Sequence, residues 1–309
     1  MADYLVTGVG GFIGAAVAAR LLAEGHSVVG VDNLTTGYAE NIPAGTEFFQ
    51  SDCQDATLYH RLPVRKYDAI LHIAGQSSGE ISFDDPVYDL RTNGESTLHL
   101  LKFALKVGCS RMVYASTMSV YGMHPDCPAK ESDPCFPHSF YGVGKLASEH
   151  YLRLYEQYGV ASAALRLFNV YGPGQNMSNL RQGMVSIFMA MMLADNHVHV
   201  KGSPDRYRDF VYIDDVVDAF MLCLHNREAR GTFNIGGSGK VTVGELIDKM
   251  AALHPVRPEI RFEGRTAGDI PGIYADISRA GAELGYSPKV SLEQGLSRMY
   301  AWAARAMQK

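Results

Sequence analysis

Thr7-Gly8-Val9-Gly10-Gly11-Phe12-Ile13-Gly14 is the most informative stretch of the sequence. A short apolar run over 2–7 leads into it, and a helix pattern over 15–24 follows. A second apolar run, over 27–32, ends in Asp32. Glycines in a turn between a strand and a helix let a pyrophosphate approach the backbone, and the helix N-terminus attracts its negative charge. The order of strand, glycine turn, helix, strand and acid therefore predicts a dinucleotide-binding site.

The acid at the end of the second strand predicts which dinucleotide binds. Asp32 is expected to accept hydrogen bonds from the ribose hydroxyls. A carboxylate at this point repels a 2′-phosphate, and no arginine follows in Asn33-Leu-Thr-Thr-Gly37. NAD is therefore favoured over NADP, and Asp52, after the next apolar run, is placed to reach the adenine amine. A glycine-rich turn without a ligand is the alternative interpretation, which the flanking strand and acid disfavour.

Apolar runs typical of buried strands continue beyond the glycine turn, with helix patterns between them. The strands expected next cover 46–49, 69–74, 112–116 and 163–168, and the helices cover 92–107 and 141–159. Strands that alternate with helices at this spacing are typical of βαβ units. The sequence therefore predicts an α/β fold with a Rossmann-like, doubly wound parallel sheet.

After the last of these strands the alternation breaks into shorter, mixed patterns. Thr242-Val-Gly-Glu245 and Ser291-Leu-Glu-Gln294 are capping boxes that begin two late helices. We expect an NAD-binding domain over 1–170, which takes back a strand from within 210–236. We expect residues 171–309 to form a smaller, mixed α/β domain that binds the substrate over the carboxyl edge of the sheet.

Tyr141 and Lys145 are the candidate catalytic pair. Their spacing of four places both side chains on one face of a helix. A phenol with a pKa near 10 is a poor base at neutral pH. A neighbouring ammonium and a bound nicotinamide ring are both positive, so both are expected to lower that pKa. The pair therefore suits removal of a proton from an alcohol or sugar hydroxyl.

Composition excludes several classes of function. The 309 residues carry a net charge of −5 without a basic run, so no nucleic-acid partner is expected. The longest apolar stretch, over 185–194, is too short to span a bilayer, and the N-terminus does not resemble a signal peptide. Five cysteines without metal-ligand spacing indicate reduced thiols and a cytoplasmic protein. The pair His197-Val-His199 lacks neighbouring ligands, so no metal site is expected.

Further short motifs accompany the glycine turn and the Tyr141–Lys145 pair. They are His72-x-Ala74-Gly75, Asn93, Ser116-Thr117-x-x-Val120-Tyr121-Gly122, Arg166-x-Phe168-Asn169-Val170-Tyr171-Gly172-Pro173-Gly174, Arg208-Asp209-Phe210, Asn234-Ile235-Gly236 and Gly268-Asp269. In this order and nearly end to end, the chain resembles the extended short-chain dehydrogenases/reductases of the NAD-dependent nucleotide-sugar epimerase/dehydratase group. The resemblance implies that Tyr141 is the base, that Lys145 binds the nicotinamide ribose, and that Thr117 hydrogen-bonds the reacting hydroxyl.

The motifs and their resemblance define two sets of candidate site residues. The cofactor set is Gly8, Gly11, Phe12, Ile13, Gly14, Asp32, Asn33, Asp52, Cys53, Ala74, Gly75, Gln76, Asn93, Tyr141 and Lys145. The substrate set is Ser77, Thr117, Ser119, Asn169, Arg208, Arg265, Asp269 and Ile273. Within it, the resemblance implies that Asn169 and Arg208 hold the nucleotide diphosphate, for which an arginine fork is well suited.

The chain departs from its relatives at two places. Many relatives have an arginine three residues before the acid of the Gly-Asp pair, where this chain has Thr266 and, one residue earlier, Arg265. Ser77 stands where several relatives have a lysine or histidine. Glu80, next to this loop, is expected to be solvated, with a substrate contact as the alternative.

The resemblance implies a reaction through a 4-keto sugar. Related 4,6-dehydratases have one or two acidic residues directly after the threonine, and related decarboxylases tend to have a glutamate at the second of these positions. This chain has Met118 and Ser119 there, and neither side chain is a useful acid. We therefore expect NAD-dependent epimerisation at C4 of a nucleotide hexose, with a UDP-sugar as substrate. Dehydration, decarboxylation, 2-epimerisation, keto-sugar reduction and a non-catalytic NAD sensor remain the alternatives.

Two further expectations follow from the resemblance. Ile273 occupies the position of the residue that limits substrate size in sugar 4-epimerases, and its intermediate size favours a sugar without an N-acetyl group. A homodimer is expected through two helices that pair across a two-fold axis in relatives. The apolar positions on these helices are Leu98, Leu101, Leu105, Leu146, Tyr151 and Leu154.

Overall fold

The structure, a computed structural model that describes residues 1–264 and 270–306, contains a central sheet of seven parallel strands. Their order across the sheet is β3-β2-β1-β4-β5-β6-β11. Their bounds are Asp3–Thr7 (β1), Ser27–Asp32 (β2), Glu47–Gln50 (β3), Ala69–His72 (β4), Arg111–Thr117 (β5), Ala161–Leu167 (β6) and Gly231–Ile235 (β11). The order reverses between β1 and β4, which confirms the predicted doubly wound sheet.

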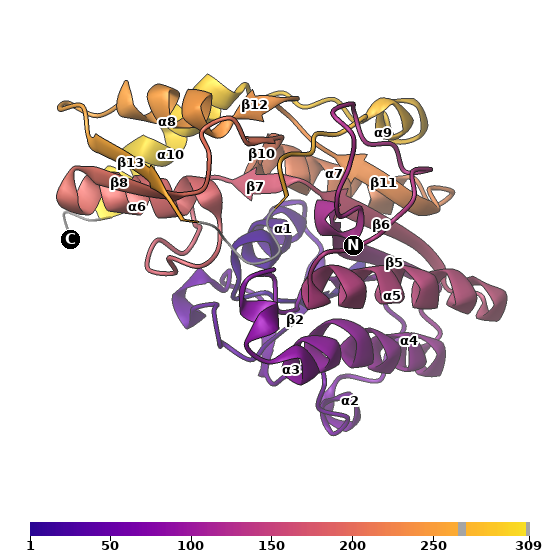
Figure 1. Cartoon of the computed structure of the whole chain (residues 1–309). Coiled ribbons are helices and arrows are strands. Elements are labelled where there is room, and N and C mark those ends of the chain that lie inside the picture. Colours follow the sequence, from indigo (N-terminus) through magenta and orange to yellow (C-terminus); the bar gives the residue numbers. More distant parts are fainter. Residues whose placement is uncertain (265–269, 307–309) are drawn as a thin grey trace.

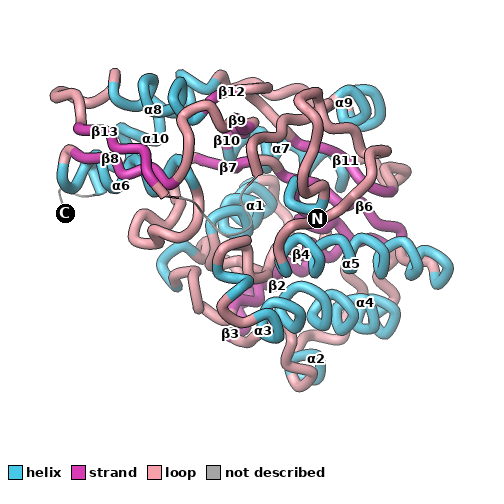
Figure 2. The backbone as a smooth tube through the Cα atoms, in the orientation of Figure 1, coloured by secondary structure: helices cyan, strands magenta, loops and turns pink. Residues whose placement is uncertain are grey.

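Helices cover both faces of this sheet (Figures 1 and 2). The helices α1 (Phe12–Ala23) and α7 (Ile213–His225) pack on one face, and α4 (Ser96–Val107) and α5 (Phe140–Tyr155) pack on the other. Alternate residues of β1 explain this arrangement. Tyr4 and Val6 enter the core under α1 and α7, whereas Leu5 enters the core under α4. A strand whose two faces are both apolar must be covered on both sides.

Helix α4 is preceded by an unusual continuous segment. After the short α2 (Leu58–Arg61), the helix α3 (Pro86–Leu90) leads into a π-helical turn, Arg91–Glu95, and the chain continues as α4. Asp85 caps α3 by accepting hydrogen bonds from the backbone N–H groups of Val87 and Tyr88. The predicted helix over 92–107 therefore belongs to a longer, kinked segment that starts before it.

The C-terminal elements form three small two-stranded sheets with helices packed around them. The strands are β7 (Asn169–Tyr171), β8 (His197–Lys201), β9 (Tyr207–Arg208), β10 (Phe210–Tyr212), β12 (Val241–Thr242) and β13 (Glu259–Glu263). The helices are α6 (Met184–Asp195), α8 (Val243–Ala251), α9 (Ser278–Leu284) and α10 (Leu292–Ala306). Figure 1 shows most of these elements gathered above the sheet in that view, whereas β11 returns to the sheet beside β6. The division into domains at residue 170 stays a prediction.

Local signals placed several boundaries well. Both predicted capping boxes are present. The side-chain oxygens of Glu245 and Gln294 each accept a hydrogen bond from the backbone N–H of the residue that caps their helix. The first helix was expected over 15–24 but begins at Phe12, because the end of the glycine turn is already helical. Among the described residues, no helix has both the length and the hydrophobicity needed to cross a membrane.

Candidate active site

A cavity of about 570 Å³ lies at the carboxyl ends of the strands, where the strand order reverses. Its walls are formed by the segments that follow β1, β2, β3, β4, β5 and β6, by Tyr141 and Lys145 of α5, and by residues between 174 and 185. Ligands of doubly wound sheets bind at such a place. Most predicted site residues meet here: Gly8, Gly11, Phe12, Ile13, Gly14, Asp32, Asn33, Asp52, Cys53, Ala74, Gly75, Gln76, Ser77, Thr117, Ser119, Tyr141, Lys145 and Asn169.

The glycine turn brings the N-terminus of α1 to the cavity. Gly8 has a φ of +77°, and the backbone N–H of Gly11 donates to the carbonyl of Gly8 at 3.0 Å. A Cβ on Gly14 would lie 1.9 Å from that carbonyl oxygen, so α1 can start here only with a glycine at this position. Gly11 caps α1 without a side chain, and no acid stands in the first turn. The free N–H groups and positive dipole end therefore face the cavity, as a phosphate-binding site requires.

Asp32 is held at the end of β2 by backbone donors. Its Oδ2 accepts from the N–H of Gly10 at 2.9 Å, and its Oδ1 accepts from the N–H of Leu34 at 2.8 Å. Each carboxylate oxygen keeps a second acceptor site for a ribose hydroxyl. Nearby, Asn33 Nδ2 donates to Asp52 Oδ2 at 2.8 Å. The two backbone contacts hold Asp32 in place, and Asp32 is the acid that is expected to favour NAD over NADP.

Lys145 is a buried ammonium beside the catalytic phenol. Its side chain donates from Nζ to the carbonyl of Ala115 at 3.0 Å, and Nζ lies 5.9 Å from the centre of the Tyr141 ring. The residue is 3% exposed, and burial lowers the pKa of its ammonium to about 8, an effect that Asp89 opposes. Lys145 is the one basic residue among the described residues that line the cavity.

The pKa of Tyr141 corrects an expectation. We expected the ammonium of Lys145 to lower it, but burial raises the pKa of Tyr141 to about 12 in the protein alone. Hydrogen bonding with the Thr117 hydroxyl acts against this rise, and the charge of Asp89 adds to it. Removal of the phenol from water is the largest effect on this pKa.

Three further polar residues of the cavity are Thr117, Ser119 and Asn169. The hydroxyl of Thr117 donates to Ser119 Oγ at 3.2 Å and accepts from the Ser119 backbone N–H. Asn169 Nδ2 donates to the backbone carbonyl of Asp209 at 2.9 Å, so its amide oxygen is the group left for a ligand. All three residues line the cavity.

Three predicted site residues lie behind the cavity wall instead of in it. Arg208 is 5% exposed, and its guanidinium donates to the backbone carbonyls of Tyr207 and Ile270. Ile273 is fully buried in a small apolar cluster with Phe168. Asn93 is fully buried and donates from Nδ2 to the carbonyl of Gln76. Arg265 and Asp269 lie outside the described residues.

A group of amide side chains on the segment that follows β7 also lines the cavity, although no sequence motif indicated it. They are Gln175, Asn176, Asn179 and Gln182, and all of them line it. Four amides within eight residues, directly after the Gly172-Pro173-Gly174 turn, were the available signal. Gln182 Nε2 donates to Ser77 Oγ, which links this segment to the loop after β4.

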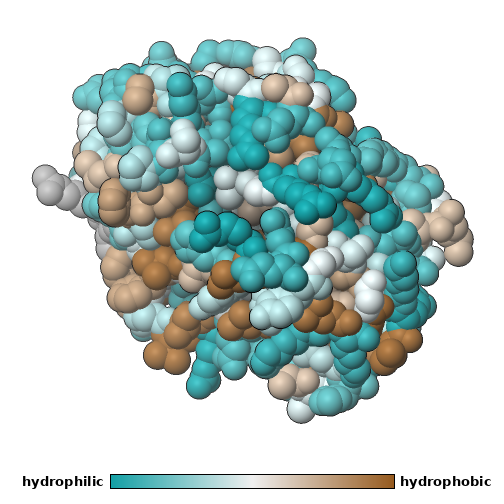
Figure 3. Space-filling model, turned by 90° about the vertical axis from the view of Figure 1, so that its right-hand side faces the viewer, coloured by the Kyte–Doolittle hydropathy of each residue, from teal (hydrophilic) through white to brown (hydrophobic). Residues whose placement is uncertain are grey.

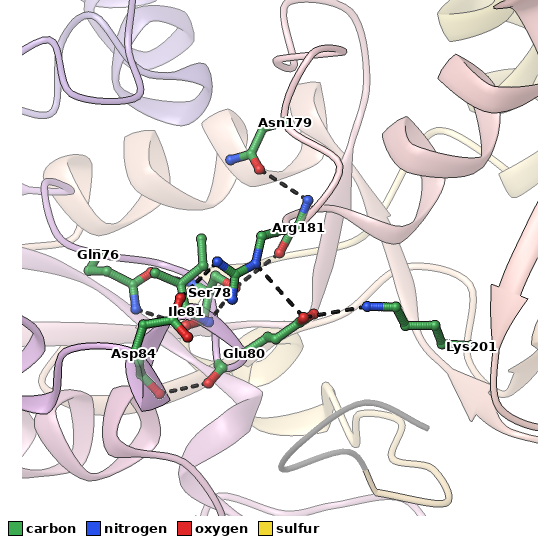
Figure 4. A network of polar contacts seen from close by, with 10 residues as sticks. Gln76, Ser78, Glu80, Ile81, Asp84, Asn179, Arg181 and Lys201 are labelled. Carbon is green, nitrogen blue, oxygen red and sulfur yellow. Dashed lines mark hydrogen bonds and ion pairs between the residues drawn. The ribbon is translucent and has the colours of Figure 1, made fainter. Parts of the chain in front are cut away.

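Glu80 belongs to a polar network at the rim of the cavity (Figure 4). Its carboxylate lies 3.4 Å from Lys201 Nζ and 3.8 Å from Arg181 Nε. Arg181 also pairs with Asp84 at 2.7 Å, and its backbone carbonyl accepts from Ser78 Oγ. Glu80 is therefore a half-buried ion-pair partner and not the freely solvated side chain that we expected.

Known proteins resemble this chain over nearly its whole length. Residues 4–236 match the model of the NAD-dependent epimerase/dehydratase family. A UDP-glucose 4-epimerase from Mycolicibacterium smegmatis is 36% identical over 301 residues, which span 95% of this chain and 96% of that protein.

Solved structures give the same picture. A UDP-glucose 4-epimerase from Thermotoga maritima, crystallised with UDP-glucose, superposes with a TM-score of 0.93 at 33% identity and covers 99% of both chains. A UDP-glucose 4-epimerase from Thermus thermophilus, in complex with NAD, has a TM-score of 0.90 at 32% identity, over 97% of this chain and 98% of that one.

Proposed function

Since the chain belongs to the NAD-dependent epimerase/dehydratase family, we propose that it epimerises a nucleotide-activated hexose, a UDP-sugar, at C4. The observation that carries this function is the placement of Thr117, Tyr141 and Lys145 in one cavity with the uncapped N-terminus of α1 and with Asp32. The three side chains can exchange a proton with a hydroxyl group, and the N-terminus of α1 with Asp32 can bind a dinucleotide.

The cavity fits NAD at three points. The N-terminus of α1 would hold the pyrophosphate, Asp32 would hold the adenosine ribose, and Lys145 has N–H donors left for the nicotinamide ribose. Bound NAD supplies a hydride acceptor and donor, so the reaction needs no second substrate. Its positive ring also lowers the pKa of a nearby phenol.

The side chains of the chain would handle the proton of the sugar 4-hydroxyl. Tyr141 would accept that proton as C4 is oxidised and return it after the sugar has presented its other face. Thr117 would hydrogen-bond the same hydroxyl, and Lys145 would favour the phenolate by its charge. Burial of Tyr141 and Lys145 keeps water away from the keto sugar between the two halves of the reaction.

Related dehydratases and decarboxylases have an acid directly after the threonine, and this chain has none there. The carboxylates in the described lining of the cavity are Asp32 and Asp52, which are expected to contact the dinucleotide. Met118 and Ser119 follow Thr117, and both line the cavity. Glu80, a carboxylate on the neighbouring loop, forms ion pairs with Arg181 and Lys201 and is absent from the described lining. We therefore expect the C4 epimer as product, and a stable 4-keto-6-deoxy sugar in the product NMR spectrum would contradict the proposal.

Substitution of the base tests the assignment directly. Tyr141→Phe should lower turnover at least about 100-fold, because only the proton acceptor is lost. Tyr155→Phe, on the same helix but away from the cavity, is the matched control and should turn over normally. NAD content by absorbance should be equal in both variants. Near-normal turnover of Tyr141→Phe would rule out the assignment.

Asp32 should determine the choice of cofactor. Asp32→Asn removes the charge that repels a 2′-phosphate, so we expect a gain of affinity for NADP, measured by titration calorimetry. Glu40→Gln makes the same charge change at an exposed position and should leave the preference for NAD intact. Equal affinity of the unaltered protein for NAD and NADP would contradict this prediction.

Size selection by Ile273 remains part of the proposal in a changed form. The side chain belongs to the same apolar cluster as Phe168, which does line the cavity, so it would act through that cluster. We expect a preference for hexoses without an N-acetyl group, by about 1–3 kcal/mol at most. Faster turnover of the N-acetylhexosamine would overturn it.

We also propose a cytoplasmic homodimer that binds its nucleotide sugar through residues 171–309. All five cysteines are free thiols, which suits a reducing compartment. Exposed apolar side chains on α3, α4 and α5, among them Val87, Leu105 and Leu154, support the dimer. Leu101 is fully buried inside its own chain and is removed from the predicted interface.

A further inference from the structure

A buried carboxylate lies behind the cavity on a helix that none of the sequence motifs includes. Asp89, in α3, is 1% exposed. It does not cap that helix, because Asp85 does so. A buried carboxylate is costly unless hydrogen bonds or an opposite charge compensate it. Its position therefore requires an explanation.

One oxygen of Asp89 fixes the loop after β4. Gln76 Nε2 donates to Asp89 Oδ2 at 2.9 Å and to the carbonyl of Ser78 at 2.8 Å. Gln76 Oε1 accepts from the N–H of Ser78. A carboxylate only accepts hydrogen bonds, so the NH₂ end of the Gln76 amide must point toward α3. Gln76 is part of the cavity wall, and its own carbonyl accepts from Asn93.

The other oxygen faces the catalytic helix. Asp89 Oδ1 accepts no hydrogen bond from any described residue. A Cβ on Gly144 would lie 3.4 Å from it, so α5 approaches this oxygen at the residue before Lys145. A Cβ on Gly75 would lie 3.3 Å from Lys145 Nζ, which places the loop that Asp89 holds against the ammonium.

Among the described residues, the other groups around Lys145 offer no compensating anion. On β4, burial lowers the pKa of His72 to about 3, so its ring is neutral. On β5, Tyr114 presents its ring face 4.7 Å from Nζ, and burial raises the pKa of its phenol. On α5 itself, Glu149 is paired with Arg166 at 2.7 Å.

We propose that Asp89 is a positioning residue, which holds Gln76 and its loop beside Lys145 and supplies the negative charge that balances the buried ammonium. The inference rests on the proposed roles of Tyr141 and Lys145. It assigns a function to a residue outside the family motifs quoted above.

The charge of Asp89 has a defined electrostatic effect on both members of the pair. An anion raises the pKa of every group near it, because it favours the more positive form. Asp89 opposes the lowering of the Lys145 pKa and adds to the raising of the Tyr141 pKa. Loss of this charge must therefore lower both pKa values.

The pH profile of the NAD-loaded enzyme tests this inference. Asp89→Asn keeps the shape of the side chain and an acceptor for Gln76 but removes the charge. In the plot of kcat against pH, the acid limb and the alkaline limb should both move to lower pH. Glu95→Gln removes an exposed carboxylate from the adjoining π-helical turn and should move neither limb. Unmoved limbs in Asp89→Asn would show a purely structural role and overturn the proposal.

Two further measurements separate this inference from folding and from the proposed function. Asp89→Glu keeps the charge, so its limbs should stay at the wild-type pH even where kcat falls. A shift equal to that of Asp89→Asn would contradict the charge argument. The affinity for NAD, measured from about pH 6 to pH 10, does not depend on turnover. The loss of NAD affinity at alkaline pH should begin at a lower pH in Asp89→Asn than in the wild type. Identical affinity profiles of the two proteins would overturn the proposal even if the chain were not an epimerase.

Discussion

Lys145 occupies an environment that opposes its charge. Burial lowers the pKa of the ammonium to about 8 from its ordinary value of 10.5. Below pH 8 both the folded and the unfolded chain carry this proton, so the folded protein bears the whole cost of the buried charge. Between pH 8 and 10.5 the unfolded chain binds more protons, so stability rises with pH and the cost disappears. The side chain is kept for chemistry and not for stability.

Lys145→Met should therefore separate stability from activity. At pH 7 the cofactor-free variant should be more stable than the wild type by on the order of 2–3 kcal/mol, because the charge penalty is gone. Activity and NAD affinity should both fall. Urea unfolding at pH 7 and near pH 10 measures the first effect, and the gain should vanish at the higher pH. Lower stability at pH 7 would mean that the bond to Ala115 and the balance by Asp89 outweigh burial.

The segments that pack over a predicted site residue decide how close it comes to the cavity. Arg208 and Ile273 were placed in the site because of their position along the chain, but backbone carbonyls and an apolar cluster hold them one layer behind it. Their environment depends on which segments pack over them. The raised pKa of Tyr141 is also a consequence of burial, which no spacing reveals.

Secondary-structure elements were more predictable because their signals are local. The apolar runs marked the core strands, and the glycine turn at Gly8 and Gly14 fixed where α1 meets the cavity. The π-helical turn Arg91–Glu95 gave no such signal. The turn matters for the site because it contains Asn93, and the helix α3 just before it contains Asp89.

The segment 174–183 is held to the rest of the cavity wall by the network of Figure 4. Arg181 is 45% exposed and Asp84 is 57% exposed, so their ion pair contributes little to stability. Its effect is instead on the position of Asn179 and Gln182, which flank Arg181 and line the cavity. We therefore expect the network to affect ligand binding more than folding.

Arg181→Ala should raise KM several-fold with little change in melting temperature, because the cavity wall loses its outer attachment. Arg257→Ala is the matched control. Arg257 forms an exposed pair with Asp248 at 2.7 Å on the chain after α8, and its loss should leave KM unchanged. Steady-state kinetics with thermal melts of both variants measure the difference. Equal KM values in the two variants would show that the network does not shape the cavity.

The surface of the molecule carries apolar groups in an uneven distribution. On the face shown in Figure 3, hydrophobic side chains form separate patches within a mainly hydrophilic surface, most of them in the lower half of the view. Val87 and Leu90 on α3, Leu105 on α4, and Val143 and Leu154 on α5 are between 41% and 58% exposed. These three helices adjoin one another in sequence or in packing. Exposed apolar side chains gathered on adjacent helices are typical of an interface.

A second copy of the chain is the partner that we expect on this surface, because two-fold dimers are the commonest assemblies and join one patch to itself. Light scattering at micromolar concentration should give twice the chain mass of 33.8 kDa. Leu154→Lys places a charge on α5 within the patch and should shift the mass toward that of one chain. Val256→Lys makes the same change at a 61% exposed position after α8 and should leave the dimer intact. A wild-type protein with the mass of a single chain would contradict the dimer, and the exposed leucines would then need another partner.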